Sequence, residues 1–119
     1  MFNTLFRTKQ SPTAARVEQV DPPELNKRLT AGTSMVLIDV RTPGEYEYDG
    51  HIAGARLLPL SMLHYRLEEL PKDSPIVCVC RSGARSQTAA EHLVTQGFTN
   101  VINLRGGMIS WKSLGLPYQ

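Results

Sequence analysis

Short apolar runs alternate along the chain with longer segments in which apolar residues recur at helical spacing. The apolar runs cover residues 15–20, 35–40, 56–58, 76–79 and 101–104. Short runs of this kind, several rich in β-branched residues and bounded by turn-forming residues, are typical of strands buried on both faces. Because strands alternate with helices, we expect an α/β fold with a five-stranded, mostly parallel sheet and helices on both faces.

Start and stop signals for helices lie in the intervening segments. We expect helices between Asp21 and Gly32, between Thr42 and Gly50, and over residues 60–70, 87–96 and 106–112. Asp21 should cap the first helix, with Glu24 completing a capping box. Thr42 and Glu45 repeat this pattern for the second helix. Gly97 follows the fourth helix directly, where a residue with left-handed backbone commonly ends a helix.

Cys80 follows the fourth apolar run directly, and a short turn connects it to a helix. The turn contains Arg81, Ser82, Gly83, Ala84, Arg85 and Ser86. At a helix N-terminus the first amide N–H groups lack partners and the helix dipole is positive, so this joint favours an anion. Such a site, with guanidinium groups nearby, can lower a cysteine pKa from about 8.5 to roughly 3.5–7.5. Cys80 is therefore predicted to be a reactive thiolate, whereas Cys78, inside the apolar run, is predicted to be a core residue.

Asp39 and Arg41 lie at the end of the second apolar run, at the same edge of the predicted sheet as Cys80. Ligands of open parallel sheets bind at this carboxyl edge. The two residues are candidates for a structural ion pair or for a chemical role. We favour the ion pair, because a carboxylate beside a needed thiolate would oppose its ionisation. His51 also has two open roles, as a general base for the cysteine or as part of the scaffold.

The composition is that of one globular domain, with 119 residues of which 41% are hydrophobic and 20% charged. A net charge of +2, without a basic face, argues against nucleic-acid binding. Two cysteines at positions i and i+2 do not make a disulfide framework, which favours a reducing, cytoplasmic location. No apolar run is long enough to span a membrane, and no His, Cys or Asp cluster has the spacing of metal ligands.

The first 14 residues are expected to form a flexible tail before a domain that covers residues 15–119. Phe2, Leu5 and Phe6 stand at helical spacing beside two cations, so a weak anchor at a membrane surface is the alternative. A single short helical turn is marginal in water, and termini are usually held loosely. Both facts favour the tail.

Three stretches of the chain together resemble the sequence signatures of the rhodanese family of sulfurtransferases. They are CRSGARS at 80–86, an upstream DVR at 39–41 with Glu45, Tyr46 and GHIAG at 50–54, and a downstream GGMISW at 106–111. The stretches occur in the order and at the spacing of the family, over roughly residues 16–117. The resemblance implies the rhodanese-like fold, again with five strands.

The resemblance also implies a function. In this family the cysteine carries a persulfide during turnover, so Cys80 would move sulfane sulfur from thiosulfate or a persulfide donor to a thiol or cyanide. The loop from Arg81 to Ser86 would bind the substrate, with Asp39 and Arg41 in support. His51 would belong to the scaffold. No metal or organic cofactor is implied, and a sulfur-relay protein would be a partner besides the small-molecule donor and acceptor.

Two other functions are alternatives. Cysteine phosphatases and arsenate reductases on this fold also use a cysteine loop, with the phosphatase pattern Cys-x5-Arg. Arg85 stands five positions after Cys80 and Ser86 is the sixth, so the loop is one residue too short for that pattern. The other alternative is a non-catalytic binding module of the same shape, although such modules tend to lose the cysteine. His64 and His92 fall on expected helices and are predicted to be surface residues.

Overall fold

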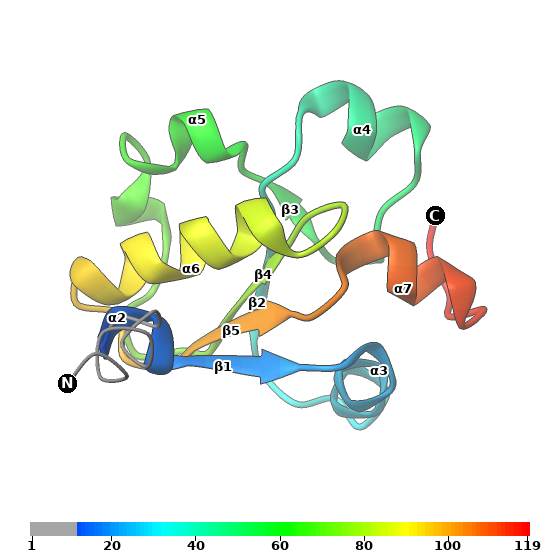
Figure 1. Ribbon diagram of the computed structural model, residues 1–119, viewed down its shortest axis with the longest axis horizontal. Helices are drawn as coiled ribbons and strands as arrows, with labels where there is room; N and C mark the ends of the chain where they lie inside the picture. Colours follow the sequence, from blue (N-terminus) through cyan, green and yellow to red (C-terminus); the bar gives the residue numbers. More distant parts are fainter. Residues whose placement is uncertain (1–11) are drawn as a thin grey trace, which may run out of the picture.

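A computed structural model of the chain describes residues 12–119 and contains one five-stranded sheet (Figure 1). The strands are β1 (Val17–Val20), β2 (Val36–Asp39), β3 (Arg56–Leu57), β4 (Ile76–Val79) and β5 (Val101–Leu104), in the spatial order β1-β5-β4-β2-β3. Every neighbouring pair of strands is parallel. The predicted α/β fold and its five strands are therefore confirmed.

Helices connect the strands and cover both faces of the sheet. They are α2 (Pro12–Ala15), α3 (Pro22–Thr30), α4 (Pro43–Tyr48), α5 (Leu60–Leu63), the 3₁₀-helix η1 (Leu67–Glu69), α6 (Ala84–Thr95) and α7 (Gly107–Ser113). On one face, apolar side chains of α5 and α6 pack with Cys78 and Cys80. On the other face, those of α3 and α7 pack with Val77 and Val79. The two-residue period of a strand thus directs both cysteines toward α6.

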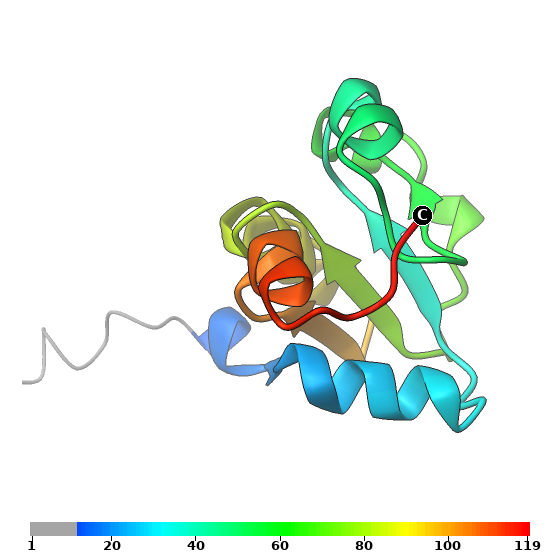
Figure 2. The ribbon, with the colours of Figure 1, turned by 90° about the vertical axis from the view of Figure 1, so that its right-hand side faces the viewer.

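The segment after α7 folds back toward the loop that follows α4 (Figure 2). The backbone groups of His51 and Gln119 exchange two hydrogen bonds, of 2.7 and 2.8 Å. Trp111 is fully buried and donates its indole N–H to the carbonyl of Pro117 at 2.8 Å. These contacts tie the loop after α4 to the C-terminal part of the domain.

The helix predicted over residues 60–70 is wrong. The chain forms α5, leaves the helical conformation at Arg66, where φ is −129° and ψ is 22°, and then forms η1. The Arg66 guanidinium binds the carboxylate of Glu69 through two hydrogen bonds of 2.8 and 2.9 Å. Leu63 and Leu70 are both buried in the same core cluster. Two separate turns therefore bury the leucines whose spacing predicted one helix.

Only one of the two predicted capping boxes forms. At the start of α4, the Thr42 hydroxyl accepts the amide N–H of Glu45, and the Glu45 carboxylate accepts the amide N–H of Thr42. Asp21 stands at the N-cap of α3, but its side chain makes no capping hydrogen bond. Its carboxylate instead accepts a 3.3 Å hydrogen bond from Arg105. The capping box predicted at Asp21 is therefore wrong, and the carboxylate points to a residue distant in sequence.

Helix α6 begins at Ala84 rather than at residue 87, so half of the predicted turn after Cys80 belongs to the helix. Its predicted stop is confirmed. Gly97 has φ +96°, and the amide N–H of Phe98 donates to the carbonyl of Leu93 at 3.1 Å. This pattern is the Schellman motif, which satisfies carbonyl groups at the end of a helix.

The domain extends further toward the N-terminus than predicted. Residues 12–14, assigned above to the tail, form most of α2, and Ala14 is buried. Strand β1 accordingly begins at Val17 rather than at residue 15. The tail or surface anchor expected over the first residues lies outside the described part of the chain. Among residues 12–119, no helix has both the length and the apolar character needed to cross a membrane.

Candidate active site

Cys80 stands directly after β4, and its side chain lies on the face that α6 covers. Its Sγ accepts hydrogen bonds from the loop and from the first turn of α6. The amide of Gly83 donates at 3.1 Å, the amide of Ser86 at 3.3 Å, and the Ser86 hydroxyl at 3.3 Å. Hydrogen bonds to the charged form of a group favour that form. The loop is therefore suited to hold an anionic sulfur.

The loop has this shape because two glycines allow its backbone to pack closely. Gly83 is the N-cap of α6 with φ +101°, in the left-handed region that other residues rarely adopt. Gly107 has φ +58°, and a Cβ there would lie 2.5 Å from the carbonyl oxygens of Cys80 and Arg81. The amide of Met108 donates to the Cys80 carbonyl at 2.9 Å. The start of α7 thus packs directly on the peptide that carries Cys80 (Figure 1).

Burial and hydrogen bonding act in opposite directions on the Cys80 thiol. Burial raises its pKa, but hydrogen bonds from the Ser86 hydroxyl and from the amides of Ser86, Gly83 and Ser82 lower it more. The pKa of Cys80 is therefore below its ordinary value. The amide donors at the helix N-terminus act as the sequence predicted. The two guanidinium groups, expected to contribute as well, are not among the main causes.

Cys78 has the opposite environment. It is fully buried in the core, and it makes no disulfide. Burial raises the pKa of the Cys78 thiol, and the nearby charge of Cys80 raises it further, as the smaller of the two causes. A thiol in apolar surroundings is a poor nucleophile because it ionises poorly. The prediction that Cys78 is a core residue is confirmed.

The two loop arginines have different surroundings. Arg85 forms a two-pronged ion pair with Glu45, with N–O distances of 2.7 and 2.8 Å. Arg81 is exposed, and its guanidinium has no ion pair or hydrogen bond with any residue from 12 to 119. Arg81 can thus meet an anionic ligand directly, whereas Arg85 shares its charge with Glu45. Glu45 was predicted only as part of a helix cap, and its pairing with Arg85 was not predicted; its place in the upstream signature was the signal for this second role.

Glu45→Gln should reduce the stability of the fold at neutral pH by about 1–2 kcal/mol, with the effect discounted because Arg85 is 37% exposed. Its hydrogen bonds with Arg85 lower the pKa of Glu45 to about 2 from an ordinary 4.5. A carboxyl group with a lowered folded-state pKa stabilises the fold above its unfolded pKa, and this stabilisation is lost as the pH falls toward 2.

Urea unfolding at about pH 7 and about pH 2.5 tests this expectation. The stability difference between wild type and Glu45→Gln should shrink in acid. Glutamine also fits the capping box of α4, so the helix cap is retained in the variant. A difference that stays constant with pH would contradict the role of the Arg85 pair.

Asp39 and Arg41 form the predicted ion pair, and both side chains are buried. The Arg41 guanidinium donates to the two carboxylate oxygens of Asp39 at 2.9 and 2.7 Å. It also donates to the Gly50 carbonyl at 2.7 Å. The pair thus joins the end of β2 to the loop after α4. The Arg41 guanidinium is neutralised by the buried Asp39 carboxylate, so the pair is better suited to hold the loop in place than to bind a substrate.

The three histidines are not among the residues that donate hydrogen bonds to Cys80 Sγ. His51 stacks on Tyr46, with ring centroids 3.7 Å apart, and its Nδ1 lies 2.9 Å from the Tyr46 carbonyl oxygen. These contacts favour the scaffold role over that of a general base. His64 and His92 approach each other at the surface, with 3.5 Å between ring nitrogens. In the described part of the chain, no group of three or more His, Cys, Asp or Glu side chains is suited to a metal ion.

Asn103 joins the site from β5 and was not among the predicted site residues. Its side chain is 4% exposed, and its Oδ1 accepts a 2.5 Å hydrogen bond from the Ser86 hydroxyl. Its Nδ2 donates to the Gly83 carbonyl at 3.3 Å and to Gln19 Oε1 at 3.0 Å. The signal was a polar residue in an otherwise apolar strand. Such a residue needs buried partners, and here the partners are the loop residues that hold the sulfur.

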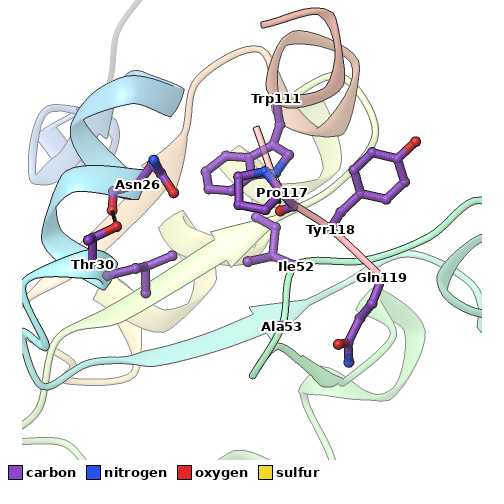
Figure 3. A pocket seen from close by; sticks show the side chains of 9 residues that line it. Asn26, Thr30, Ile52, Ala53, Trp111, Pro117, Tyr118 and Gln119 are labelled. Atoms are coloured by element: carbon purple, nitrogen blue, oxygen red, sulfur yellow. Dashed lines mark hydrogen bonds between the residues drawn. The ribbon is translucent and has the colours of Figure 1, made fainter. Parts of the chain in front are cut away.

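A cavity of about 410 Å³ lies away from the cysteine loop, among α3, the loop after α4 and the C-terminal segment (Figure 3). Its walls include the apolar side chains of Ile52, Trp111 and Pro117. Two smaller cavities, of about 310 and 290 Å³, adjoin Arg85 and Arg81 respectively. Cys80 has no exposed surface. Access to the sulfur therefore requires movement of the atoms that cover it.

Comparison with known proteins agrees with this geometry. A family model described as the rhodanese-like domain matches residues 21–114. A sulfurtransferase of Allochromatium vinosum is 44% identical over 101 residues, which cover 85% of this chain and 94% of the relative. Thiosulfate sulfurtransferase GlpE of Coxiella burnetii is 40% identical over 79 residues, covering 66% of this chain and 73% of the relative. The solution structure of the polysulfide-sulfur transferase homodimer of Wolinella succinogenes matches with a TM-score of 0.77 and 28% identity, covering 99% of this chain and 89% of that one.

The family model matches most of the chain, and the five-stranded parallel sheet agrees with the fold of the structural relative. The cysteine loop lies within the matched residues, at the carboxyl edge of the sheet. This chain therefore belongs to the rhodanese-like family, and the relatives to which it is similar include sulfurtransferases.

Proposed function

We propose that this protein transfers sulfane sulfur from thiosulfate or a related persulfide donor to a thiol or cyanide through a persulfide on Cys80. The observation that carries the proposal is the cradle around Cys80 Sγ, made by the amides of Gly83 and Ser86 and by the Ser86 hydroxyl. These donors lower the pKa of the thiol despite its burial. A thiolate is the form of cysteine that attacks sulfur.

In the first half-reaction, the Cys80 thiolate attacks the outer sulfur of thiosulfate. A bond forms between Sγ and that sulfur, while the bond to the sulfite sulfur breaks and sulfite leaves with the electron pair. Cys80 then carries a persulfide whose terminal sulfur is negative. The loop from Arg81 to Ser86 would hold this terminal anion with its amide groups, as an oxyanion hole holds oxygen.

In the second half-reaction, an acceptor thiolate or cyanide attacks the terminal sulfur. The bond between the two sulfurs of the persulfide breaks, and Cys80 leaves as a thiolate. A sulfur with a lowered pKa is a better leaving group, so the cradle assists this step as well. The covalent intermediate predicts double-displacement kinetics. The acceptor in the cell is proposed to be a small thiol or the cysteine of a sulfur-relay protein.

Intact-mass spectrometry tests the intermediate directly. After incubation with thiosulfate, the wild-type protein should gain one sulfur atom, and cyanide should remove it. The Cys80→Ser variant should gain none, whereas Cys78→Ala should still gain one. A wild-type protein that stays unmodified under these conditions, while folded, would overturn the proposed function.

The same preparation separates sulfur transfer from the alternatives. An aryl phosphate should not be turned over, because the loop is one residue shorter than the phosphatase pattern and Arg85 is paired with Glu45. A non-catalytic binding module would neither gain sulfur nor turn over phosphate. Phosphate turnover without sulfur loading would favour the phosphatase alternative.

Arg81→Gln should lower kcat/KM for thiosulfate about fivefold, which corresponds to about 1 kcal/mol for an exposed charge that contacts an anion. Thiosulfate is a dianion, and the guanidinium of Arg81, which pairs with no residue from 12 to 119, adjoins a cavity that Met108 and Lys112 also line. Turnover by the wild-type protein should fall as salt rises, because salt screens exposed charges. The salt dependence should be weaker in the variant.

A matched control is Arg16→Gln. Arg16 is exposed and precedes β1, at the opposite edge of the sheet from Cys80. This variant changes the net charge equally but should leave kcat/KM for thiosulfate unchanged. Two results would contradict direct binding of the anion by Arg81. One is an equal loss of kcat/KM for thiosulfate in Arg81→Gln and Arg16→Gln. The other is a loss of kcat/KM in Arg81→Gln that is as large with an uncharged persulfide donor as with thiosulfate.

A further inference from the structure

The Ser86 hydroxyl has one proton but two hydrogen-bond acceptors. Its Oγ lies 3.3 Å from Cys80 Sγ and 2.5 Å from Asn103 Oδ1. A serine hydroxyl can donate only one hydrogen bond at a time. Ser86 is fully buried, so bulk solvent does not reach its hydroxyl. At any one time the hydroxyl therefore donates its proton either to Cys80 Sγ or to Asn103 Oδ1.

The Asn103 amide cannot turn around to remove this competition. Its Nδ2 lies 3.3 Å from the carbonyl oxygen of Gly83, which can only accept hydrogen bonds. Its second Nδ2 proton goes to Gln19 Oε1 at 3.0 Å. If the amide were reversed, two carbonyl oxygens would face each other in a buried site. The Gly83 carbonyl thus keeps Asn103 Oδ1 directed at Ser86.

We propose that Asn103 is a positioning residue, which holds the Ser86 hydroxyl proton while the Cys80 sulfur is neutral and yields it when that sulfur becomes a thiolate. The change is a rotation of the Ser86 O–H bond. No proton leaves the serine oxygen, and no covalent bond forms or breaks. A thiolate competes well for the proton because a hydrogen bond to an ionised acceptor is the stronger one.

The persulfide part of this inference rests on the proposed function. In the persulfide, Cys80 Sγ is bonded to a second sulfur and is a weak hydrogen-bond acceptor. The Ser86 hydroxyl then donates to Asn103. When the acceptor attacks and negative charge develops on Sγ, the hydroxyl turns to the leaving sulfur. Asn103 thereby accepts the hydrogen bond of the Ser86 hydroxyl in the resting persulfide. It also keeps the Ser86 oxygen next to Cys80 Sγ for the second half-reaction.

Other charged and titratable groups surround the sulfur. They are Arg81 in the loop, Arg85 on α6 with its partner Glu45 from α4, Asp39 and Arg41 at the end of β2, and Cys78 on β4. None of these side chains hydrogen-bonds to Ser86 or Asn103 within residues 12–119. Glu91 joins the network only through Gln87 and Gln19. The competition for the hydroxyl is therefore between Cys80 and Asn103.

The test measures the pH dependence of Cys80 alkylation by iodoacetamide in the purified protein, with the modified residue identified by peptide mapping. In Asn103→Leu the Ser86 hydroxyl has no acceptor except the sulfur. The midpoint of alkylation should therefore fall by about 0.5–1 pH unit. In the Ser86→Ala background, Asn103→Leu should leave the midpoint unchanged within about 0.2 unit. An equal shift in both backgrounds would overturn the inference, because it would show an effect through the Gly83 carbonyl alone.

Gln19→Leu is the matched control. It removes the partner on the far side of Asn103 and leaves both the Ser86 and the Gly83 contacts in place. Its alkylation midpoint should equal that of the wild type. A shift as large as that of Asn103→Leu would also contradict the inference, since it would point to general loosening of the network.

A second measurement needs no substitution at Asn103, so it remains decisive if Asn103→Leu fails to fold. The NMR signal of the Asn103 side-chain carbonyl carbon should move with pH at the midpoint of Cys80 alkylation. The movement should vanish in Ser86→Ala and in Cys80→Ser. No movement in the wild type would overturn the inference. Neither readout requires a sulfur donor, so a protein that gains no sulfur from thiosulfate would refute the proposed function and leave this test intact.

Discussion

Cys80→Ser is expected to abolish sulfur transfer, by about a thousandfold or more, while the protein stays folded. A serine hydroxyl does not ionise near neutral pH and is a poor acceptor of sulfane sulfur. The substitution is nearly isosteric, and the amides of Gly83 and Ser86 can donate to the new hydroxyl. We expect a loss of only about 1 kcal/mol in the free energy of unfolding. Steady-state sulfur transfer and urea unfolding measure the two effects.

Cys78→Ala is the matched control for that substitution. Cys78 lies two residues away on the same strand and faces the same side of the sheet, but it is fully buried among apolar residues. The variant should lose about 1–2 kcal/mol of stability through the cavity it creates, and it should keep its activity. A folded Cys78→Ala protein without activity would mean that two thiols take part in turnover.

The second large effect is expected for Gly107→Ala. The new Cβ would lie 2.5 Å from the carbonyl oxygens of Cys80 and Arg81, and φ at this position is +58°. The backbone at Gly107 and the backbone at Cys80 and Arg81 must move apart to make room for the Cβ. We therefore expect a loss of about 3 kcal/mol or more in the free energy of unfolding. Sulfur transfer should fall at least about a hundredfold even where the protein is folded, because the displaced peptide carries the nucleophile.

Gly115→Ala separates the clash from the backbone conformation. Gly115 has φ +72°, similar to that of Gly107, but a Cβ there would meet no heavy atom within 4 Å. This variant should lose only about 1 kcal/mol of stability and should keep its activity. Comparable losses of activity in both variants would show that left-handed backbone at either end of α7 matters, and not the contact with the loop.

Much of the fold could be predicted because its signals are local. The β-branched run at Ile76–Val79 and the stop at Gly97 depend on neighbouring residues, and the structure has both. The errors have non-local causes. Residues 60–70 carry a helical spacing of leucines, yet the chain breaks at Arg66 and buries those leucines in two turns. The capping box at Asp21 does not form, and its carboxylate accepts a hydrogen bond from Arg105, 84 positions away in the sequence.

The sequence by itself determined that a cysteine follows a buried strand and precedes a helix N-terminus. That information lies within residues 76–86, where strand end, glycine turn and helix start are consecutive. A nucleophile and the amides that hold it can therefore be predicted from one short segment. The separation of Cys78 from Cys80 is equally local, because one lies within the strand and the other at its end.

Only the tertiary structure decided which side chains tune that nucleophile. Glu45 meets Arg85 across 40 positions of sequence, and Asn103 meets Ser86 across 17. Parallel strands bring these residues together, because the carboxyl ends of β2, β4 and β5 share one edge of the sheet whatever their distance in sequence. Side-chain hydrogen bonds act over about 3 Å. The pairing of Arg85 with Glu45, and the presence of two acceptors around the Ser86 hydroxyl, therefore depend on tertiary packing. The pattern of apolar residues along the sequence does not predict them.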